Sequence, residues 1–300
     1  MSTTQHSNSS RGIYLSTVRN VRMLCREHFE ITLSLPNFPP ASPGQFLQVR
    51  CSAPDAGSSA GSVAVPILRR PFSIGGLRRR TGVVEIDLLG RVVGPGTTWL
   101  SARRPGDKVD LLGPLGNCFS IPAPSDRALL IAGGIGLPPI RWFAEILHEN
   151  SIPATAIFGA QTKDFIPLTL TQEPDPSGRP TRCVEEFACE EIDTIITTDD
   201  GSCGLHGRVT DALVCLLNTS DLPSRVYACG PEPMLRAVGE MCGAHGMPCE
   251  LAMERVMACG MGTCQSCVLP VIDPTHDTGW RYALCCTEGP IFAAERIRWA

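Results

Sequence analysis

The 300-residue sequence lacks long apolar runs, clusters of basic residues and an apolar signal-peptide core in its first residues. Its longest apolar stretch, residues 128–140, is short and rich in glycine and proline, so it is not expected to span a bilayer. The polar residues 1–11 are expected to form a disordered tail. The net charge is −4, so binding to a polyanion such as a nucleic acid is not expected. We therefore expect a cytoplasmic protein that binds neither nucleic acid nor membranes.

Cysteine, by contrast, is abundant, with 15 residues. Disulfide scaffolds are short secreted chains, whereas this chain is long and its cysteine count is odd, so most of these residues are expected to be buried thiols. Ten are scattered along the chain. The other five, which alone have the spacing of metal ligands, are Cys259, Cys264, Cys267, Cys285 and Cys286.

Residues 12–122 consist of short runs in which apolar and polar residues alternate, as in residues 29–35. Glycine and proline separate these runs, and no long helical period interrupts them. This pattern predicts an antiparallel β-barrel domain. The composition of residues 52–62 indicates a flexible loop within it.

After residue 122 the pattern changes to strands that alternate with helices. Strands are expected at 127–134, 153–160, 193–201 and 224–233, and helices at 137–149, 208–218 and 234–246. This alternation predicts a doubly wound α/β domain over 123–245, with ligands at the carboxyl ends of its strands. Residues 246–300 return to short strands and loops, so the fold class is a multidomain α+β protein with a small C-terminal segment around the cysteines.

Two motifs in the predicted barrel have chemistry suited to a flavin or nucleotide. The first combines Arg70, Pro71, Phe72 and Ser73, because a guanidinium can bind pyrophosphate beside an aromatic ring. A surface arginine beside an ordinary strand is the commoner explanation. The second, residues 94–101, contains Gly96 and Thr97, which can approach an anion or form a plain turn.

A third motif lies between a predicted strand and a helix. Gly133, Gly134 and Gly136 would let a phosphate approach the helix N-terminus, which favours nucleotide binding over a structural turn. Cys229 and Gly230 end the last parallel strand and are expected at the same edge of the sheet, although a buried cysteine is an equally good explanation. No acidic residue follows the second strand, so the sequence does not choose between NAD and NADP.

The C-terminal cysteines have C-x4-C-x2-C spacing, which is typical of plant-type [2Fe-2S] sites. The fourth ligand can be Cys285 or Cys286. Structural zinc sites usually have two C-x(2–4)-C pairs. Cys285 and Cys286 are adjacent and do not form such a pair. Because adjacent side chains on an extended backbone point apart, only one of them is expected to ligate. Small residues in the loop can direct backbone N–H groups at sulfide. Iron–sulfur is therefore favoured over zinc.

The order of motifs RPFS, AGGIG, TDDGS, CGPEPM, CGMGTCQSC and CTEGPIF resembles the electron transfer subunits of NAD-dependent dihydroorotate dehydrogenases, within the ferredoxin–NADP reductase superfamily. The resemblance covers about residues 12–293 and implies FAD, a [2Fe-2S] cluster and NAD as cofactors. It implies Cys286 as the fourth cluster ligand, because two residues and then Gly-Pro follow it. The FAD residues that it implies are Arg70, Pro71, Phe72, Ser73, Leu89, Gly90, Arg91, Gly96 and Thr97. Departures from the family pattern are Gly90 at a usually aromatic position, an inserted loop at 52–62, and residues 136–139.

By this resemblance, electrons leave dihydroorotate in a separate FMN-containing catalytic subunit and pass through the cluster and FAD to NAD+, in pyrimidine (UMP) biosynthesis. A flavin connects the two-electron chemistry of nicotinamide with the one-electron cluster. A heterotetramer of two copies of each subunit is expected, with no catalytic residue in this chain. Two alternatives remain at this point: an NAD(P)H–flavin–iron–sulfur module of a hydrogenase, sulfide dehydrogenase or transhydrogenase, and a zinc-stapled, nucleotide-binding regulatory module.

Overall fold

The computed structural model describes residues 11–52, 66–187, 190–218 and 222–299. The expected N-terminal tail and the expected loop at 52–62 lie outside the described residues, apart from Arg11 and Ser52.

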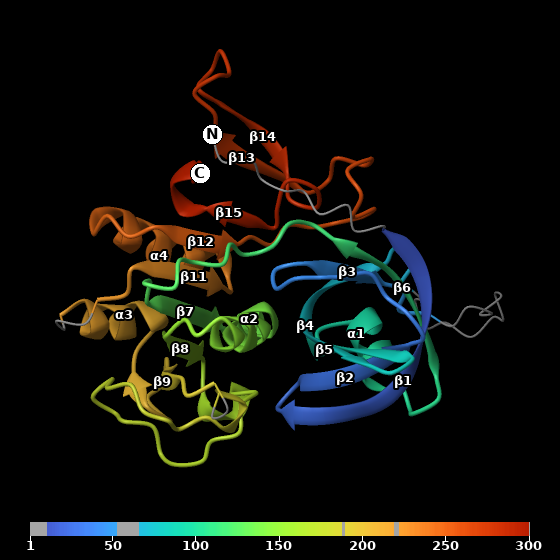
Figure 1. Ribbon diagram of the computed structural model, residues 1–300, viewed down its shortest axis with the longest axis horizontal. Helices are drawn as coiled ribbons and strands as arrows, with labels where there is room; N and C mark the ends of the chain where they lie inside the picture. Colours follow the sequence, from blue (N-terminus) through green and yellow to red (C-terminus); the bar gives the residue numbers. More distant parts are fainter. Residues whose placement is uncertain (1–10, 53–65, 188–189, 219–221, 300) are drawn as a thin grey trace.

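The first part of the chain is a closed antiparallel barrel of six strands in the order β1-β2-β5-β4-β3-β6 (Figure 1). The barrel predicted from the alternating pattern is confirmed, and Phe29, Ile31 and Leu33 are fully buried in its core. The strands are β1 (Gly12–Cys25), β2 (His28–Leu35), β3 (Phe46–Val49), β4 (Arg70–Arg80), β5 (Val83–Arg91) and β6 (Lys108–Leu115).

Two elements of the barrel differ from expectation. Strand β1 was not predicted, because register shifts at Val18/Asn20 and Met23/Cys25 break its alternation. Residues 94–101 were expected to be a glycine loop or turn, but they contain the helix α1 (Pro95–Ser101). Thr97 Oγ1 accepts hydrogen bonds from the backbone N–H groups of Val93 and Gly94 at 3.0 and 3.2 Å, so it closes the first turn of this helix.

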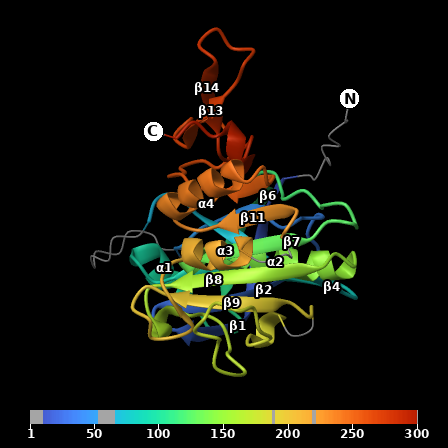
Figure 2. The ribbon, with the colours of Figure 1, turned by 90° about the vertical axis from the view of Figure 1, so that its left-hand side faces the viewer.

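The second part is a seven-stranded sheet in the order β10-β9-β8-β7-β11-β12-β15, in which only β15 is antiparallel to its neighbour. Helix α2 covers one face, and α3 and α4 cover the other (Figures 1 and 2), which confirms the doubly wound arrangement. The strands are β7 (Ala128–Gly133), β8 (Ala154–Ala160), β9 (Asp193–Thr198), β10 (Leu205–His206), β11 (Arg225–Cys229), β12 (Cys249–Ala252) and β15 (Ile291–Ala293). The helices are α2 (Leu137–Glu149), α3 (Val209–Leu217) and α4 (Glu232–Ala244), with short 3-10 turns η1 (Gly134–Gly136), η2 (Lys163–Phe165), η3 (Glu185–Phe187) and η4 (Ala294–Arg296).

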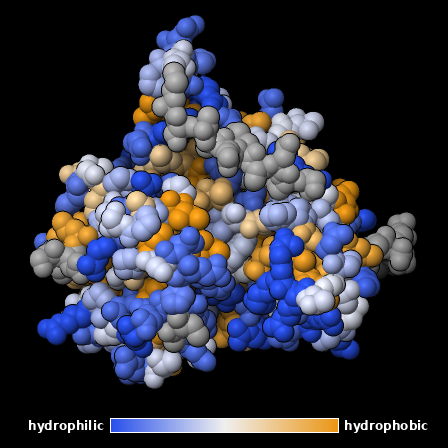
Figure 3. Space-filling model, in the orientation of Figure 1, coloured by the Kyte–Doolittle hydropathy of each residue, from blue (hydrophilic) through white to orange (hydrophobic). Residues whose placement is uncertain are grey.

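The C-terminal segment contributes two strands to this sheet. Strands β12 and β15 belong to the sheet although they lie within residues 246–300, and between them the chain forms the cysteine loop and a projecting hairpin of β13 (Val268–Ile272) and β14 (Trp280–Leu284). The tip of this hairpin is hydrophilic on the face shown in Figure 3. The base of the segment, which includes Cys267, Leu269 and Cys286, packs in one apolar core with Phe46 of the barrel.

Helix α2 joins the barrel to the sheet. Arg141 on α2 forms an ion pair with Glu30 on β2 at 2.8 Å, and each side chain is only 10% exposed. Glu30 also accepts a hydrogen bond from Arg22 at 2.8 Å, so its charge is balanced inside the contact. This ion pair therefore links α2 to β2 of the barrel. No helix within the described ranges is both long and apolar enough to cross a membrane.

Candidate functional site

A cavity of about 1050 Å³ lies where the barrel meets the carboxyl edge of the sheet. The cavity brings together every residue that the sequence predicted to bind FAD or NAD, although they come from separate halves of the chain. These are Arg70, Pro71, Phe72, Ser73, Leu89, Gly90, Arg91, Gly96, Thr97, Gly133, Gly134, Gly136, Cys229 and Gly230. One cavity therefore joins the two predicted sites.

The barrel side of the cavity is formed by β4, the end of β5 and α1. Gly90 stands at the position where the resemblance implied an aromatic residue. A Cβ atom there would lie 2.6 Å from the Phe29 ring and 3.0 Å from the Phe72 ring, so these two rings already occupy the space of a side chain. Leu89 and Phe72 are buried, and they supply apolar wall suited to a flat ring.

Arg91 connects the two halves at this wall. Its guanidinium lies 4.8 Å from the ring centroid of Phe165 in η2 and forms an ion pair with Glu27 at 2.9 Å. A cation over an aromatic face is favourable by about 0.5–1 kcal/mol at exposed sites. The side chain predicted to contact FAD thus also contacts the nucleotide-binding half.

The sheet side of the cavity is formed by close backbone contacts. Gly136 has no room for a side chain, because a Cβ atom would lie 2.1 Å from the carbonyl oxygen of Cys229. Gly134 has φ +52° and faces open space. The backbone at Gly134 is therefore open to close approach by a phosphate or nicotinamide, whereas the Met234 side chain lies against Gly133 and Gly230. Burial raises the pKa of the Cys229 thiol to about 12, so this thiol is neutral at pH 7.

Several residues of the cavity were missed by the sequence reasoning. Thr197 is near the carboxyl end of β9 and Asp199 directly follows it, so the rule that ligands lie at the carboxyl ends of parallel strands was sufficient to find them. Thr197 Oγ1 is buried and has no hydrogen-bond partner among the described residues. Arg208 precedes α3 and adds a positive charge to the same wall. Phe165 comes from the irregular stretch after β8, where no periodicity gave a signal.

The cysteine loop brings thiols together in two pairs. Cys259 Sγ accepts a hydrogen bond from the backbone N–H of Cys264 at 3.4 Å, and Cys259 helps to lower the pKa of Cys264. Cys267 Sγ accepts one from the backbone N–H of Cys286 at 3.4 Å, and Cys267 helps to raise the pKa of Cys286. Among residues 11–52, 66–187, 190–218 and 222–299, no three His, Cys, Asp or Glu side chains surround a single point as ligands of one ion. Two pairs of thiols with N–H groups directed at sulfur fit a two-iron cluster better than a single zinc ion.

Cys264 is the exposed member of this set. The Ser266 hydroxyl lies 3.2 Å from its Sγ and, with backbone N–H groups, lowers the pKa of Cys264 to about 6. A low pKa favours the thiolate, which is the form that binds metal. The chemistry of the donor set is therefore suited to iron.

Cys285 has different surroundings from its neighbour Cys286. Its thiol is fully buried and donates a hydrogen bond to the carbonyl oxygen of Met253 at 3.1 Å. Burial raises the pKa of both Cys285 and Cys286 to about 12, so the hydrogen bond to Met253 is what distinguishes Cys285. A neutral, hydrogen-bonded thiol has the features of a packing residue.

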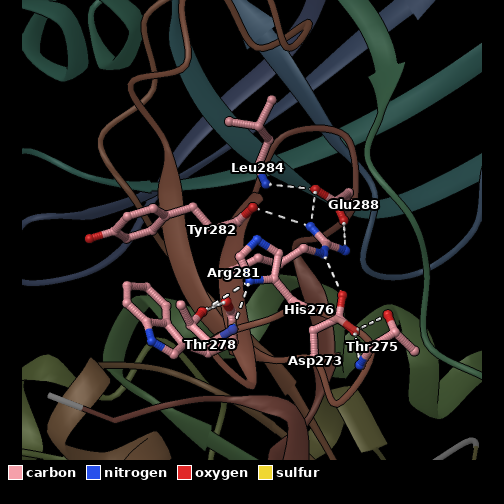
Figure 4. A network of polar contacts seen from close by, with 9 residues as sticks. Asp273, Thr275, His276, Thr278, Arg281, Tyr282, Leu284 and Glu288 are labelled. Atoms are coloured by element: carbon pink, nitrogen blue, oxygen red, sulfur yellow. Dashed lines mark hydrogen bonds and ion pairs between the residues drawn. The ribbon is translucent and has the colours of Figure 1, made fainter.

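A polar network fixes the turn that carries both cysteines (Figure 4). Glu288 accepts hydrogen bonds from Arg281 at 2.5 and 3.1 Å and from the backbone N–H of Leu284 at 3.1 Å. Arg281 also donates to Asp273 at 3.0 Å, so β13, β14 and the turn after β14 are joined. The Arg281 guanidinium lowers the pKa of Glu288, which keeps this carboxylate ionised.

Comparison with known proteins agrees with this geometry. Residues 254–298 match the family model of the iron-sulfur cluster binding domain of dihydroorotate dehydrogenase B, and residues 130–240 match the oxidoreductase NAD-binding domain. Among solved structures, the NADH-dependent reduced ferredoxin–NADP oxidoreductase is similar with a TM-score of 0.73 and 26% identity, over 96% of this chain and 91% of that one. A cytochrome P450 reductase from Amycolatopsis shares the fold at a TM-score of 0.60 and 21% identity, over 82% of this chain and 70% of that one.

Curated relatives match over nearly the whole length. The dihydroorotate dehydrogenase B (NAD(+)) electron transfer subunit of Geobacillus kaustophilus is 37% identical, over 94% of this chain and 96% of its own. The subunit of the same name from Streptococcus mutans is 33% identical, over 94% and 96%. Together with the fold, these matches support FAD, a [2Fe-2S] cluster and NAD as cofactors and disfavour the zinc alternative. The chain belongs to the family of dihydroorotate dehydrogenase B (NAD(+)) electron transfer subunits.

Proposed function

We propose that this subunit carries electrons from the FMN of a catalytic dihydroorotate dehydrogenase subunit, through a [2Fe-2S] cluster and FAD, to NAD+ in the cytoplasm. The observation that carries the proposal is the single cavity in which the flavin strands and the nucleotide strand ends face each other, with the cysteine loop packed on the barrel beside them. Bound FAD would exchange electron pairs with nicotinamide and single electrons with the cluster. We propose an assembly of two copies of each subunit.

The residue roles follow from position in the cavity. Arg70, Pro71, Phe72 and Ser73 on β4, with Leu89, Gly90 and Arg91 at the end of β5 and Gly96 and Thr97 on α1, would bind FAD. Gly133, Gly134 and Gly136 would bind the nucleotide phosphates, and Cys229 and Gly230 would adjoin the nicotinamide. Cys259, Cys264, Cys267 and Cys286 would ligate the irons. The proposed units are the flavin unit at residues 12–122, the nucleotide unit at 123–245 and the cluster unit at 246–300. The last two share a sheet.

The proposal is tested by reconstitution. The purified chain should contain one FAD and two irons, and with an FMN-containing catalytic subunit it should reduce NAD+ when dihydroorotate is supplied. A colourless protein with zinc and no iron would overturn it. A cluster-bearing flavoprotein that copurifies with a different partner, and is inert with dihydroorotate, would instead favour a module for another donor, as the similarity to a ferredoxin–NADP oxidoreductase allows.

A substitution separates the two cofactors. Cys264→Ser should remove the iron and abolish electron exchange with the partner, because Cys264 is one of the thiols of the loop. Dye reduction by NADH through FAD should remain within about twofold of wild type, because Cys264 does not line the cavity. Loss of FAD together with iron would show that Cys264 serves folding instead.

A further inference from the structure

Gln48 on β3 is a buried side chain without a partner. It is 0% exposed, and neither its Nε2 nor its Oε1 makes a hydrogen bond within the described residues. A buried amide is unfavourable unless it is hydrogen-bonded, and most such groups in folded proteins find partners. The side chain is therefore positioned for a group that the polypeptide itself does not supply.

The direction of the Gln48 side chain follows from the alternation of β3. Leu47 and Val49 point into the barrel core, whereas Phe46 lies in the core shared with the C-terminal segment. Gln48 shares the outward face with Phe46, beneath the cysteine loop. In Figure 1 the C-terminal segment lies above the β3 side of the barrel.

The contact is with the residue next to a cysteine. Gly260 directly follows Cys259 and has φ +70°, and a Cβ atom on it would lie 2.7 Å from Cγ and 2.8 Å from Nε2 of Gln48. On its other side, Gln48 is the register partner of Pro71 on the flavin-lining strand β4. The unpaired amide thus lies between the proposed flavin strand and the proposed cluster loop.

We propose that the Gln48 side-chain N–H group donates a hydrogen bond to the sulfur atoms of the [2Fe-2S] cluster held by the loop of Cys259, and thereby raises its reduction potential. This inference rests on the proposed function, since it requires the cluster. Reduction adds negative charge to the cluster, so a donor to its sulfur atoms stabilises the reduced state more than the oxidised one. Gln48 is a tuning residue, because Cys259, Cys264, Cys267 and Cys286 remain the ligands.

Gln48→Met tests the proposal, because methionine has a similar length without an N–H donor. We expect two irons per chain, an altered electron paramagnetic resonance spectrum of the reduced cluster, and an equilibrium for cluster reduction about tenfold less favourable, which is about 59 mV for a one-electron couple. The cluster-free variant should unfold at a higher temperature than cluster-free wild type, since an unpaired buried amide has been removed.

Gln45→Met is the matched control. Gln45 lies three residues earlier, donates to the carbonyl of Gly116 at 2.9 Å and accepts from the Ser42 N–H at 3.0 Å. Its loss should lower thermal stability and leave the spectrum and potential of the cluster unchanged.

An unchanged potential and spectrum in an iron-replete Gln48→Met protein would overturn the inference. If that variant does not retain iron, Gln48→Leu is measured in its place: it is uncharged, lacks any hydrogen-bond donor and must also lower the potential, and an unchanged potential would again reject the inference. Wild-type protein without a [2Fe-2S] signal would contradict the proposed function itself, which distinguishes the two failures.

Discussion

At the scale of single residues, the adjacent thiols Cys285 and Cys286 show how neighbours in sequence acquire different chemistry. Cys285 donates to the carbonyl of Met253, while Cys286 interacts with Cys267. Both cysteines lie in the turn after β14 and not on the extended backbone that the sequence suggested, and this turn directs Cys285 to the core near β12 and Cys286 to Cys267. This difference supports Cys286 as the proposed fourth ligand.

We expect Cys285→Ser to retain two irons per chain, because a serine hydroxyl can donate to the same carbonyl. Its stability should fall by about 1 kcal/mol, since a polar hydroxyl replaces a buried thiol. Cys286→Ser should reduce iron to background. Iron content and the visible spectrum measure both variants. If Cys285→Ser loses iron while Cys286→Ser keeps it, the assignment of the fourth ligand is reversed.

At the scale of elements, ion pairs link the β13–β14 hairpin to the turn after β14, which carries Cys285 and Cys286. Arg281 on β14 pairs with Glu288 after the turn and with Asp273 after β13. Both side chains of the Arg281–Glu288 pair are partly exposed, so the pair itself contributes little to global stability. Its effect is local, because Glu288 also accepts from the backbone N–H of Leu284, two residues before Cys286.

Arg281→Met should therefore loosen the cluster without unfolding the protein. Residues that orient metal ligands typically change metal affinity by about 10–100-fold when mutated, so we expect iron loss to a chelator to be about tenfold faster. Lys163→Met is the control, because Lys163 forms a partly exposed 3.6 Å pair with Glu173 in the nucleotide-binding half. Equal rates of iron loss in the Arg281 variant and wild type would show that the network does not support the turn.

At the scale of the whole molecule, the contact between α2 and the barrel contains a carboxyl with a shifted pKa. Burial raises the pKa of Glu145 to about 7. Arg141 and Arg78 oppose this shift, and Glu190 and Asp87 reinforce it. Since the unfolded carboxyl titrates near 4.5, the folded protein holds an extra proton between about pH 4.5 and 7.

The free energy of unfolding should fall as pH rises through this window, because the folded state there binds more protons than the unfolded state. Glu145→Gln mimics the protonated carboxyl and should be about 1–2 kcal/mol more stable than wild type at pH 8, a value reduced for the partial exposure of the side chain. The difference should vanish toward pH 5. Urea unfolding at both pH values measures it, with Glu149→Gln, exposed on the same helix, as the charge-matched control. An identical difference at pH 5 and pH 8 would refute the assignment.

The sequence by itself determined the fold class and most of the regular elements. Alternation in residues 29–35 and the strand–helix order after residue 122 depend on local periodicity, which sets the buried face of each element. The cysteine spacing and the glycines of 133–136 are equally local. Local patterns failed where regularity was absent, as at the bulged β1, at α1, and in the stretch that carries Phe165.

Only the tertiary structure decided which distant residues meet. Gly136 lies against the carbonyl of Cys229, Arg91 lies over Phe165, and Gln48 lies beneath Gly260. None of these contacts follows from spacing, because each is formed by packing between elements far apart in the chain. The environments of Cys285 and Glu145 likewise arise from burial and from neighbours on other elements, and these shift a pKa only once the chain has folded.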